Sequence, residues 1–237
     1  MNNLITQIRV RFPKDALPEG IHAKVLRGAI CAQDPDNPIL SQHDGTNYVW
    51  TYPKVHYRWW GDLGYIIGFG KEASQLITSL TLPGTVLQMG DYEVPIIGTD
   101  ALMRPLEVKE SRRMIRYPFL SPWLALNQRN NQEYFRLSYE ERTRKLDKIA
   151  RNQLVNTFAD LEIPLDFNVQ AFAHTVGDCF PVHYKDTEEG KPVNLAGFWG
   201  YLICNIELPS FFAVGQKTSF GHGWLRVNQD DPQEVIQ

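Results

Sequence analysis

One histidine of this chain stands in a short polar stretch, the kind of place where residues that do chemistry are often found. His43 lies in the segment Ser41–Gly45, between the apolar pair Ile39-Leu40 and an aromatic run that starts at Tyr48. Loops carried on a rigid scaffold hold many catalytic side chains, and an imidazole titrates near neutral pH. His43 is therefore a candidate general acid or general base.

The other histidines have simpler interpretations. His22 falls in the first turn of a predicted helix and reads most easily as a solvated side chain, and His56 alternates along a predicted strand as a sheet-face residue. His174, Cys179 and His183 could supply three zinc ligands, but no fourth ligand follows at the spacing of a metal finger. We therefore predict no metal site.

A glycine-rich stretch near the end of the chain, Phe211–Leu225, combines glycines with a lysine and two hydroxyl side chains. Glycine permits positive φ and close backbone approach, and successive amides in such a turn can form a site for an anion. Ser210 stands where a phosphate-binding Walker loop would have its first glycine. The simpler interpretation is a tight turn before a last strand at 223–227.

The segment from Arg104 to Arg151 is the basic part of an otherwise acidic chain. It holds twelve lysines and arginines against six acids, interleaved with aromatic residues, whereas the whole chain has a net charge of −3. Such a patch suits a phosphate backbone with some base stacking. A helix face of ion pairs is an equally good interpretation, since Glu140 and Arg144, and Glu141 and Lys145, are four residues apart.

These residues need a scaffold, and the first half of the chain predicts one. Leu4–Phe12 alternates as a strand with Arg9 and Arg11 on its open face, and Gly20–Ala32 has helical spacing. Ile39–Asn47 reads as a loop, 48–59 and 65–69 as a strand pair, 71–80 as a helix and 84–97 as a further extended run. The order β-α-β-β-α-β is that of a ferredoxin-like domain.

The second half predicts a less regular version of the same pattern. Ser138–Glu141 has the sequence of a capping box at the start of a long helix. Strands are predicted at 165–173, 180–185 and 193–207, with a turn at 188–191. We expect an α+β fold of two tandem ferredoxin-like (RRM-like) domains, residues 1–100 with the candidate catalytic loop and residues 101–237, the second irregular.

Composition bounds the class of protein. A chain of 237 residues with 43% hydrophobic side chains can bury a substantial core, and its pI of about 6.1 excludes a uniformly basic surface. Three widely spaced cysteines do not suggest a disulfide framework. No signal-peptide core or membrane-length apolar run is seen, so we expect a cytoplasmic protein with no membrane partner.

At this point the sequence resembles a known family. An aromatic-Gly-x-Gly-aromatic ending, here Phe220–Trp224, is similar to the glycine-rich loop of the CRISPR-associated repeat-processing endoribonucleases, which are built from ferredoxin-like domains. One branch has an arginine-glycine helix, a histidine-rich loop, a Tyr-Pro-x-aliphatic-Gln-Tyr-Lys strand and an Ile-Leu-Gly strand. Arg27-Gly28, His43, Tyr52–Arg58 and Ile66–Gly68 follow that order, with His56 in place of the glutamine and Arg58 in place of the lysine.

The resemblance implies a metal-independent endoribonuclease without a cofactor, which cuts CRISPR repeat RNA in precursor transcripts by attack of the RNA's own 2′-hydroxyl. The products would carry a 2′,3′-cyclic phosphate and a 5′-hydroxyl. His43 would be the base or acid, with Tyr57 or His22 as its partner. The expected RNA-binding residues are Gly215, Lys217, Thr218, Ser219, Gly221, Gly223, Arg112, Arg113 and Arg116. Repeat RNA is the expected partner, with other CRISPR effector subunits a further candidate.

One departure from the branch keeps alternatives open. The branch often has more than one histidine in its loop, whereas Ser41 and Gln42 stand beside His43 here. A single histidine would then act alone, or His22, His56 or Tyr57 would join it, or activity would be weak. Two other classes remain: a non-catalytic RNA-binding subunit of a CRISPR effector complex, and an unrelated ferredoxin-like protein that binds a small anion at the glycine-rich stretch.

Overall fold

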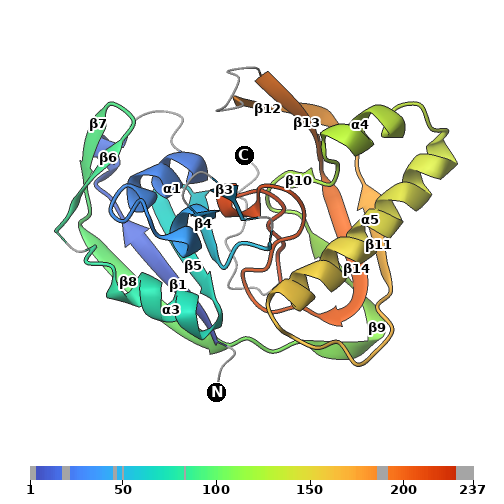
Figure 1. Cartoon of the computed structure of the whole chain (residues 1–237), viewed down its shortest axis with the longest axis horizontal. Helices are drawn as coiled ribbons and strands as arrows, with labels where there is room; N and C mark the ends of the chain where they lie inside the picture. The colour runs from blue at the N-terminus through green and yellow to red at the C-terminus, as the bar shows by residue number, and fades with distance from the viewer. Residues whose placement is uncertain are drawn as a thin grey trace. The chain divides into compact units, whose positions relative to one another are not determined.

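The computed structural model of this protein describes residues 4–17, 22–44, 47–49, 51–82, 84–185 and 192–227. The chain forms two compact units (Figure 1). The first consists of the chain up to Glu107 together with Ser219–Gly221, and the second consists of Val108–Thr218 together with the chain from His222 onward. Three residues of the glycine-rich stretch therefore belong to the first unit.

The first unit has a four-stranded antiparallel sheet in the order β4-β5-β1-β8. Its strands are β1 (Leu4–Arg11), β4 (Val55–Trp60), β5 (Leu63–Phe69) and β8 (Gly98–Pro105). Helix α1 (Ala23–Cys31) follows β1, and helix α3 (Gly70–Ser79) follows β5. This is the ferredoxin-like order β-α-β-β-α-β, so the fold predicted for this half is confirmed.

Smaller elements decorate this frame: the 3-10 turn η1 (Lys14–Ala16), helix α2 (Pro38–Ser41), the pair β2 (His43–Asp44) and β3 (Asn47–Tyr48), and the hairpin β6 (Val86–Met89) and β7 (Tyr92–Pro95). The predicted loop at 39–47 is thus a short helix followed by a strand pair. The extended run predicted at 84–97 folds back at Gly90, whose φ is 65°, and the fourth strand of the sheet is β8 instead. An edge strand without a buried residue lacks the apolar alternation from which a strand is predicted.

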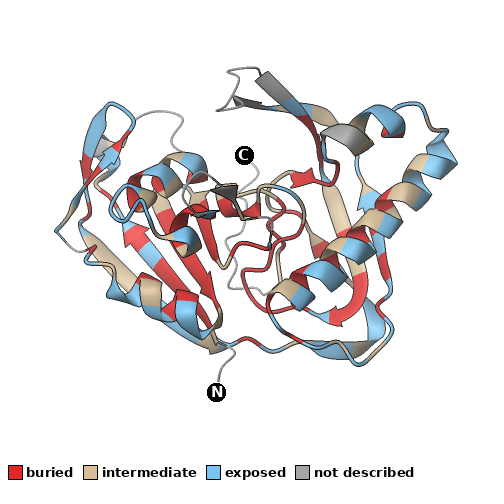
Figure 2. Cartoon of the chain, viewed as in Figure 1, coloured by how far each residue is buried: buried red, intermediate tan, exposed pale blue. Residues whose placement is uncertain are grey.

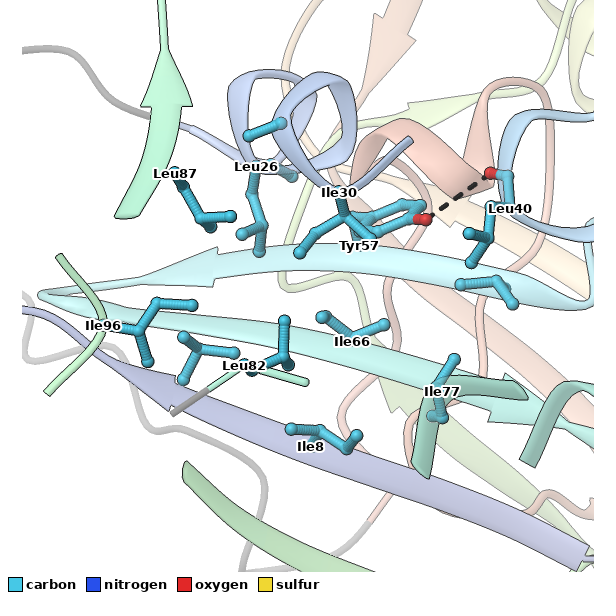
Figure 3. Close-up of a cluster of buried hydrophobic side chains, with 14 of the residues drawn as sticks. Ile8, Leu26, Ile30, Leu40, Tyr57, Ile66, Ile77, Leu82, Leu87 and Ile96 are labelled. Carbon is cyan, nitrogen blue, oxygen red and sulfur yellow. Dashed lines mark hydrogen bonds between the residues drawn. The ribbon is translucent and has the colours of Figure 1, made fainter. Parts of the chain in front are cut away.

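One face of the sheet and the helices enclose the core of the first unit (Figure 3). Ile8 and Val10 of β1 are buried together with Tyr57, Ile66 and Leu26. Burying a side chain of this size contributes about 1.5 to 3 kcal/mol. Arg9 and Arg11 point to the opposite face of β1. They remain exposed and pair with Asp100 of β8 at 2.7 and 3.2 Å.

The second unit contains two three-stranded sheets, in the orders β11-β14-β9 and β10-β13-β12. Their strands are β9 (Lys109–Pro118), β10 (Trp123–Leu124), β11 (Ala171–Thr175), β12 (Phe180–Lys185), β13 (Pro192–Phe198) and β14 (Gly200–Glu207); the helices are α4 (Gln128–Tyr134) and α5 (Tyr139–Asp160). The 3-10 turn η2 (Thr218–Phe220) lies in the glycine-rich stretch. In chain order, β9, β11 and β14 have the positions of the first three ferredoxin strands, so this unit is an incomplete copy.

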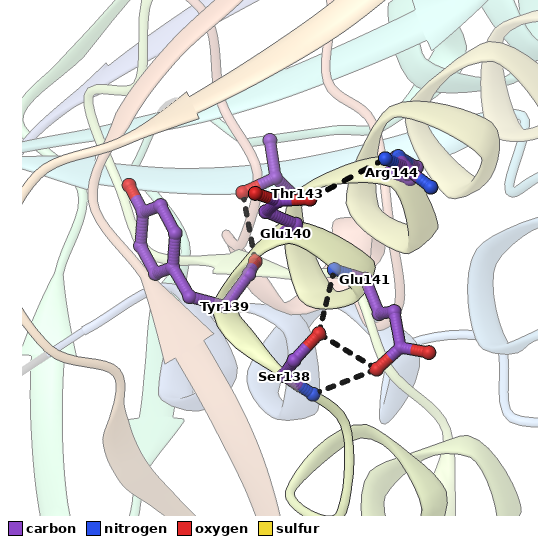
Figure 4. A network of polar contacts seen from close by, with 6 residues as sticks. All are labelled: Ser138, Tyr139, Glu140, Glu141, Thr143 and Arg144. Carbon is purple, nitrogen blue, oxygen red and sulfur yellow. Dashed lines mark hydrogen bonds and ion pairs between the residues drawn. The ribbon is translucent and has the colours of Figure 1, made fainter.

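Helix α5 covers one face of the β11-β14-β9 sheet. It starts with the predicted capping box, in which the Ser138 amide donates to the Glu141 carboxylate at 2.9 Å and the Glu141 amide donates to the Ser138 hydroxyl (Figure 4). Leu146, Leu154 and Phe158 are buried on the sheet side, and the opposite side of the helix is largely exposed (Figure 2). None of the helices in the described ranges is both long enough and apolar enough to cross a membrane.

Three strand predictions in this half are corrected. The run 193–207 is two strands in different sheets, because the extended backbone is interrupted before Gly200, where φ is 138°. The strand predicted at 165–173 is β11, a few residues later. The last strand predicted at 223–227 is reduced to isolated bridges, which join Leu225 to Phe119 and Trp224 to Ala213. The turn predicted at 188–191 lies outside the described residues.

Candidate functional site

His43 follows a sharp reversal at the end of α2. Asn37 caps this helix by accepting the Ile39 amide at 3.1 Å, and Gln42 ends it in the left-handed conformation, with φ 58°. The Ser41 hydroxyl accepts the His43 amide at 3.1 Å and donates to the Asn37 carbonyl at 2.9 Å. The His43 residue itself is exposed. The backbone before the imidazole is therefore fixed while the side chain can be reached from solvent.

The Gln42 side chain is held from both sides. Its carbonyl oxygen accepts a hydrogen bond of 2.9 Å from the hydroxyl of Ser219, and its amide donates to the Thr51 carbonyl at 3.3 Å. Both Gln42 and Ser219 are buried. Removing one partner of a buried pair leaves a desolvated polar atom, which costs about 1 to 3 kcal/mol. The glycine-rich stretch thus fixes the residue directly before His43.

Arg27 of α1 ties the same two segments together. Its guanidinium donates to the Ser41 carbonyl and lies 4.3 Å from the centre of the Phe220 ring. Next to it, a Cβ on Gly221 would come within 2.7 Å of the Ala23 side chain. Ser219–Gly221 therefore packs closely against α1 and α2, inside the first unit.

The two candidate partners of His43 differ in exposure. Tyr57 is fully buried, its hydroxyl donates to the Leu40 carbonyl at 3.5 Å (Figure 3), and burial holds the pKa of its phenol well above the usual value. These features favour a role in supporting α2 over proton exchange with a substrate. His22 is exposed at the N-cap of α1. In the described part of the chain, no hydrogen bond joins it to His43.

His56 and Arg58 form a buried polar pair on β4. The His56 Nδ1 atom lies 3.0 Å from one guanidinium nitrogen of Arg58, and the other terminal nitrogen of this guanidinium donates to the Tyr57 carbonyl at 3.1 Å. The His56 ring packs against Tyr52 and Phe69. Burial, reinforced by Arg58, lowers the pKa of His56 well below its usual value, and burial lowers the pKa of Arg58 to about 10. His56 is therefore a neutral interior residue.

In the glycine-rich stretch, the glycines are required by the protein's own packing. Gly215, Gly221 and Gly223 all have positive φ, and a Cβ on Gly215 would lie 2.8 Å from the Trp123 ring. Backbone carbonyls already accept the amides of residues 214, 216, 222 and 223. The anion site predicted here would have to use the remaining amides.

The polar side chains of this stretch are placed differently from one another. Thr218 and Ser219 are buried, and the Ser219 hydroxyl is engaged by Gln42. Lys217 is half-buried, in the left-handed conformation with φ 55°. Of these three side chains, Lys217 is the most accessible to a phosphate.

Arg112, Arg113 and Arg116 lie on β9 and are all exposed. Among the described residues, no carboxylate forms an ion pair with any of the three. The Arg116 guanidinium stacks 3.3 Å from the centre of the Tyr201 ring. β9 thus presents positive charge that a nucleic-acid phosphate could neutralise.

Of the two ion pairs predicted on α5, one is confirmed and one is wrong. Arg144 does pair with Glu140, at 3.4 Å. The Glu141 carboxylate accepts hydrogen bonds within the capping box instead, and Lys145 pairs with Glu133 of α4 at 2.6 Å. Across the described ranges, no cluster of three or more His, Cys, Asp or Glu side chains that could hold a metal ion is found.

Both units of the chain match models of known protein domains. The Cas6b N-terminal domain model matches residues 3–104 and the Cas6b C-terminal domain model matches residues 109–227. An uncharacterized protein of Methanocaldococcus jannaschii is 31% identical over 113 residues, which is 48% of this chain and 72% of that protein.

Solved structures agree on the fold. A crystal structure of Cas6b has a TM-score of 0.77 at 18% identity, over 96% of this chain and 100% of its own. The CRISPR RNA processing endoribonuclease Cas6b has a TM-score of 0.66 at 17% identity, over 94% and 98%. Csf5, a type IV Cas6 crRNA endonuclease, has a TM-score of 0.61 at 16% identity, over 95% and 99%.

Proposed function

This chain belongs to the Cas6b family of CRISPR repeat-processing endoribonucleases, and from that premise we propose that it cuts CRISPR repeat RNA without a metal ion. The observation that carries the proposal is the placement of His43, an exposed imidazole on a backbone fixed by α2 and by Ser219. Repeat RNA is the substrate, and the first unit carries the catalytic loop.

The chemistry requires two proton transfers. A base takes the proton of the 2′-hydroxyl, whose oxygen attacks the adjacent phosphorus. The bond to the 5′-oxygen breaks, and an acid protonates that oxygen, leaving a 2′,3′-cyclic phosphate and a 5′-hydroxyl. His43 serves one of these steps, and exposed His22 is the candidate for the other. Lys217, half-buried in the glycine-rich stretch, binds a phosphate of the RNA. Tyr57, in this proposal, acts by supporting α2.

The experiment is incubation of the protein with end-labelled repeat RNA in EDTA, followed by analysis of the product ends. We expect cleavage that is insensitive to EDTA and products with a 2′,3′-cyclic phosphate. Cleavage that requires Mg²⁺, or a 3′-hydroxyl product, would contradict the mechanism. Tight binding without any cleavage would favour the non-catalytic RNA-binding subunit.

Arg113→Ala is expected to remove one phosphate contact, because this exposed guanidinium has no carboxylate partner among the described residues. The slope of log K against log salt concentration should fall by about 0.7 to 0.9. Repeat-RNA titrations across salt concentrations measure it, with Arg144→Ala as the matched control, since Arg144 is an exposed arginine paired with Glu140. An unchanged slope for Arg113→Ala would place this residue off the RNA path.

Ser219→Ala is expected to slow single-turnover cleavage about 10- to 100-fold, since it removes one of the two hydrogen bonds that hold the Gln42 side chain beside His43. Gln42→Ala should have the same effect, and the double variant no larger one. Ser74→Ala is the control: this buried hydroxyl of α3 donates to the Gly68 carbonyl at 3.4 Å, so its loss should lower the melting temperature and leave the rate unchanged. Cleavage by Ser219→Ala at the wild-type rate would show that the hydrogen bond does not position His43.

A further inference from the structure

The face of the β11-β14-β9 sheet that points away from α5 carries aromatic rings in solvent. Along β11, Ala171 and Ala173 are buried whereas Phe172 is 48% exposed and His174 is exposed. Side chains alternate between the two faces of a strand, so Phe172 and His174 share the face that α5 leaves open. On β14 the buried Leu202 separates the half-buried Tyr201 and Ile203, which share it too.

The strand register makes these residues neighbours. His174 lies opposite Tyr201, Phe172 opposite Ile203, and Ile203 opposite Arg116 of β9. We define the stacking face as Phe172, His174, Tyr201, Ile203 and Arg116. Directly opposite side chains of paired strands are about 4.5 to 5.5 Å apart at Cβ, so the five form one continuous surface.

Tyr201 is the centre of the stacking face. Its ring centroid lies 6.0 Å from that of His174, and the Arg116 guanidinium lies 3.3 Å from the ring centre. Phe172, in contrast, offers a largely exposed ring. Aromatic rings and arginine planes on an open sheet are the groups on which unpaired RNA bases stack.

The charge around the stacking face matches a polyanion. Arg112 and Arg113 lie in β9 a few residues before Arg116. The acids of the three strands are Glu110 and Glu207, which pair with Ile206 and Lys109 at one end of the ladder. The middle of the sheet therefore has positive charge and no carboxylate, which favours RNA over an acidic protein segment as the occupant.

We propose that the stacking face binds unpaired nucleotides of RNA, with bases stacked on Phe172 and Tyr201 and a phosphate near Arg116, while Arg112 and Arg113 add positive charge along β9. The choice of RNA over DNA rests on the proposed function. The site itself requires no cleavage, because it lies on the second unit and uses neither His43 nor the glycine-rich stretch.

The test uses Phe172→Ala, Tyr201→Leu and the double variant in the full-length protein. The probe is an unstructured oligouridylate RNA that contains 2-aminopurine, a base whose fluorescence is quenched by stacking. Each single variant should weaken binding about 5- to 100-fold and reduce the quenching, while the salt dependence stays unchanged. Tyr139→Ala, which removes an aromatic ring that is 84% exposed on α5, should behave as wild type.

The outcomes separate this site from the proposed function. If the folded double variant binds and quenches the probe like wild type, the stacking face is not an RNA site, whatever the protein does to repeat RNA. If wild type fails to cleave repeat RNA while the variants still lose affinity and quenching, the stacking face is confirmed as an RNA site and the proposed function is wrong. Should Tyr201→Leu misfold, Phe172→Ala decides alone, because its exposed ring contributes little to the core.

Discussion

His43→Ala is expected to slow single-turnover cleavage of repeat RNA by at least about two orders of magnitude, because a general acid or base typically contributes about 10²- to 10⁴-fold. The imidazole is exposed, so its removal should leave the melting temperature and RNA affinity nearly unchanged. Rates measured with protein in excess over labelled repeat RNA report the chemical step directly.

Three other histidines serve as controls for this result. His183→Ala removes an exposed imidazole of the second unit, held by Asn194 at 2.6 Å, and should cleave like wild type. His22→Ala should give an intermediate loss if it supplies the second proton transfer. His56→Ala should lower stability, because its ring is buried against Tyr52 and Phe69. If His43→Ala cleaves at the wild-type rate and His22→Ala is inactive, the active site lies at the start of α1 and not at His43.

Gly223→Ala is expected to destabilise the second unit by about 4 kcal/mol or more, among the largest effects of a single substitution. Gly223 has a φ of 64°, and a Cβ there would lie 1.8 Å from the Val214 carbonyl oxygen. The backbone must shift and break the hydrogen bonds of the Gly223 and Val214 amides. For a chain of this size the melting temperature should fall by about 10 °C.

Gly177→Ala is the matched control for that substitution. Gly177 lies in the same unit with a φ of 71°, but nothing lies within 4 Å of a Cβ added there. It should therefore show only the cost of left-handed backbone, about 1 to 2 kcal/mol. Equal melting temperatures for the two variants would mean that the stretch before Trp224 adapts without strain, and that its glycine is not needed for packing.

Elements with a strong local pattern could be predicted from the sequence. β1 alternates apolar and polar residues, and α5 begins with a capping box that needs only Ser138 and Glu141. β8 could not be found in this way, because an edge strand bearing Asp100 and the exposed Met103 has no buried face to mark it. The break at Gly200 depends on which sheet each flanking strand joins, a choice made by tertiary packing.

The candidate site shows the same division between local and distant causes. His43 was predicted because its own neighbours are polar, and the structure describes it as exposed. The hydrogen bond between Gln42 and Ser219 joins residues 177 positions apart, and neither residue has a sequence context that points to the other. His56 and Arg58 alternate on one strand, which could have indicated a shared face, but their burial depends on packing that no local pattern specifies.

The position of Ser219–Gly221 inside the first unit has a consequence for how the chain matures. Residues before Glu107 leave the ribosome long before Ser219 is added, and during synthesis N-terminal segments fold first. Until Ser219 and Phe220 have been synthesised, the nascent first unit lacks the hydroxyl that holds Gln42 and the ring that covers Arg27. A recombinant fragment ending at Glu107 would lack them permanently, so a fragment that preserves the His43 loop needs the glycine-rich stretch grafted back.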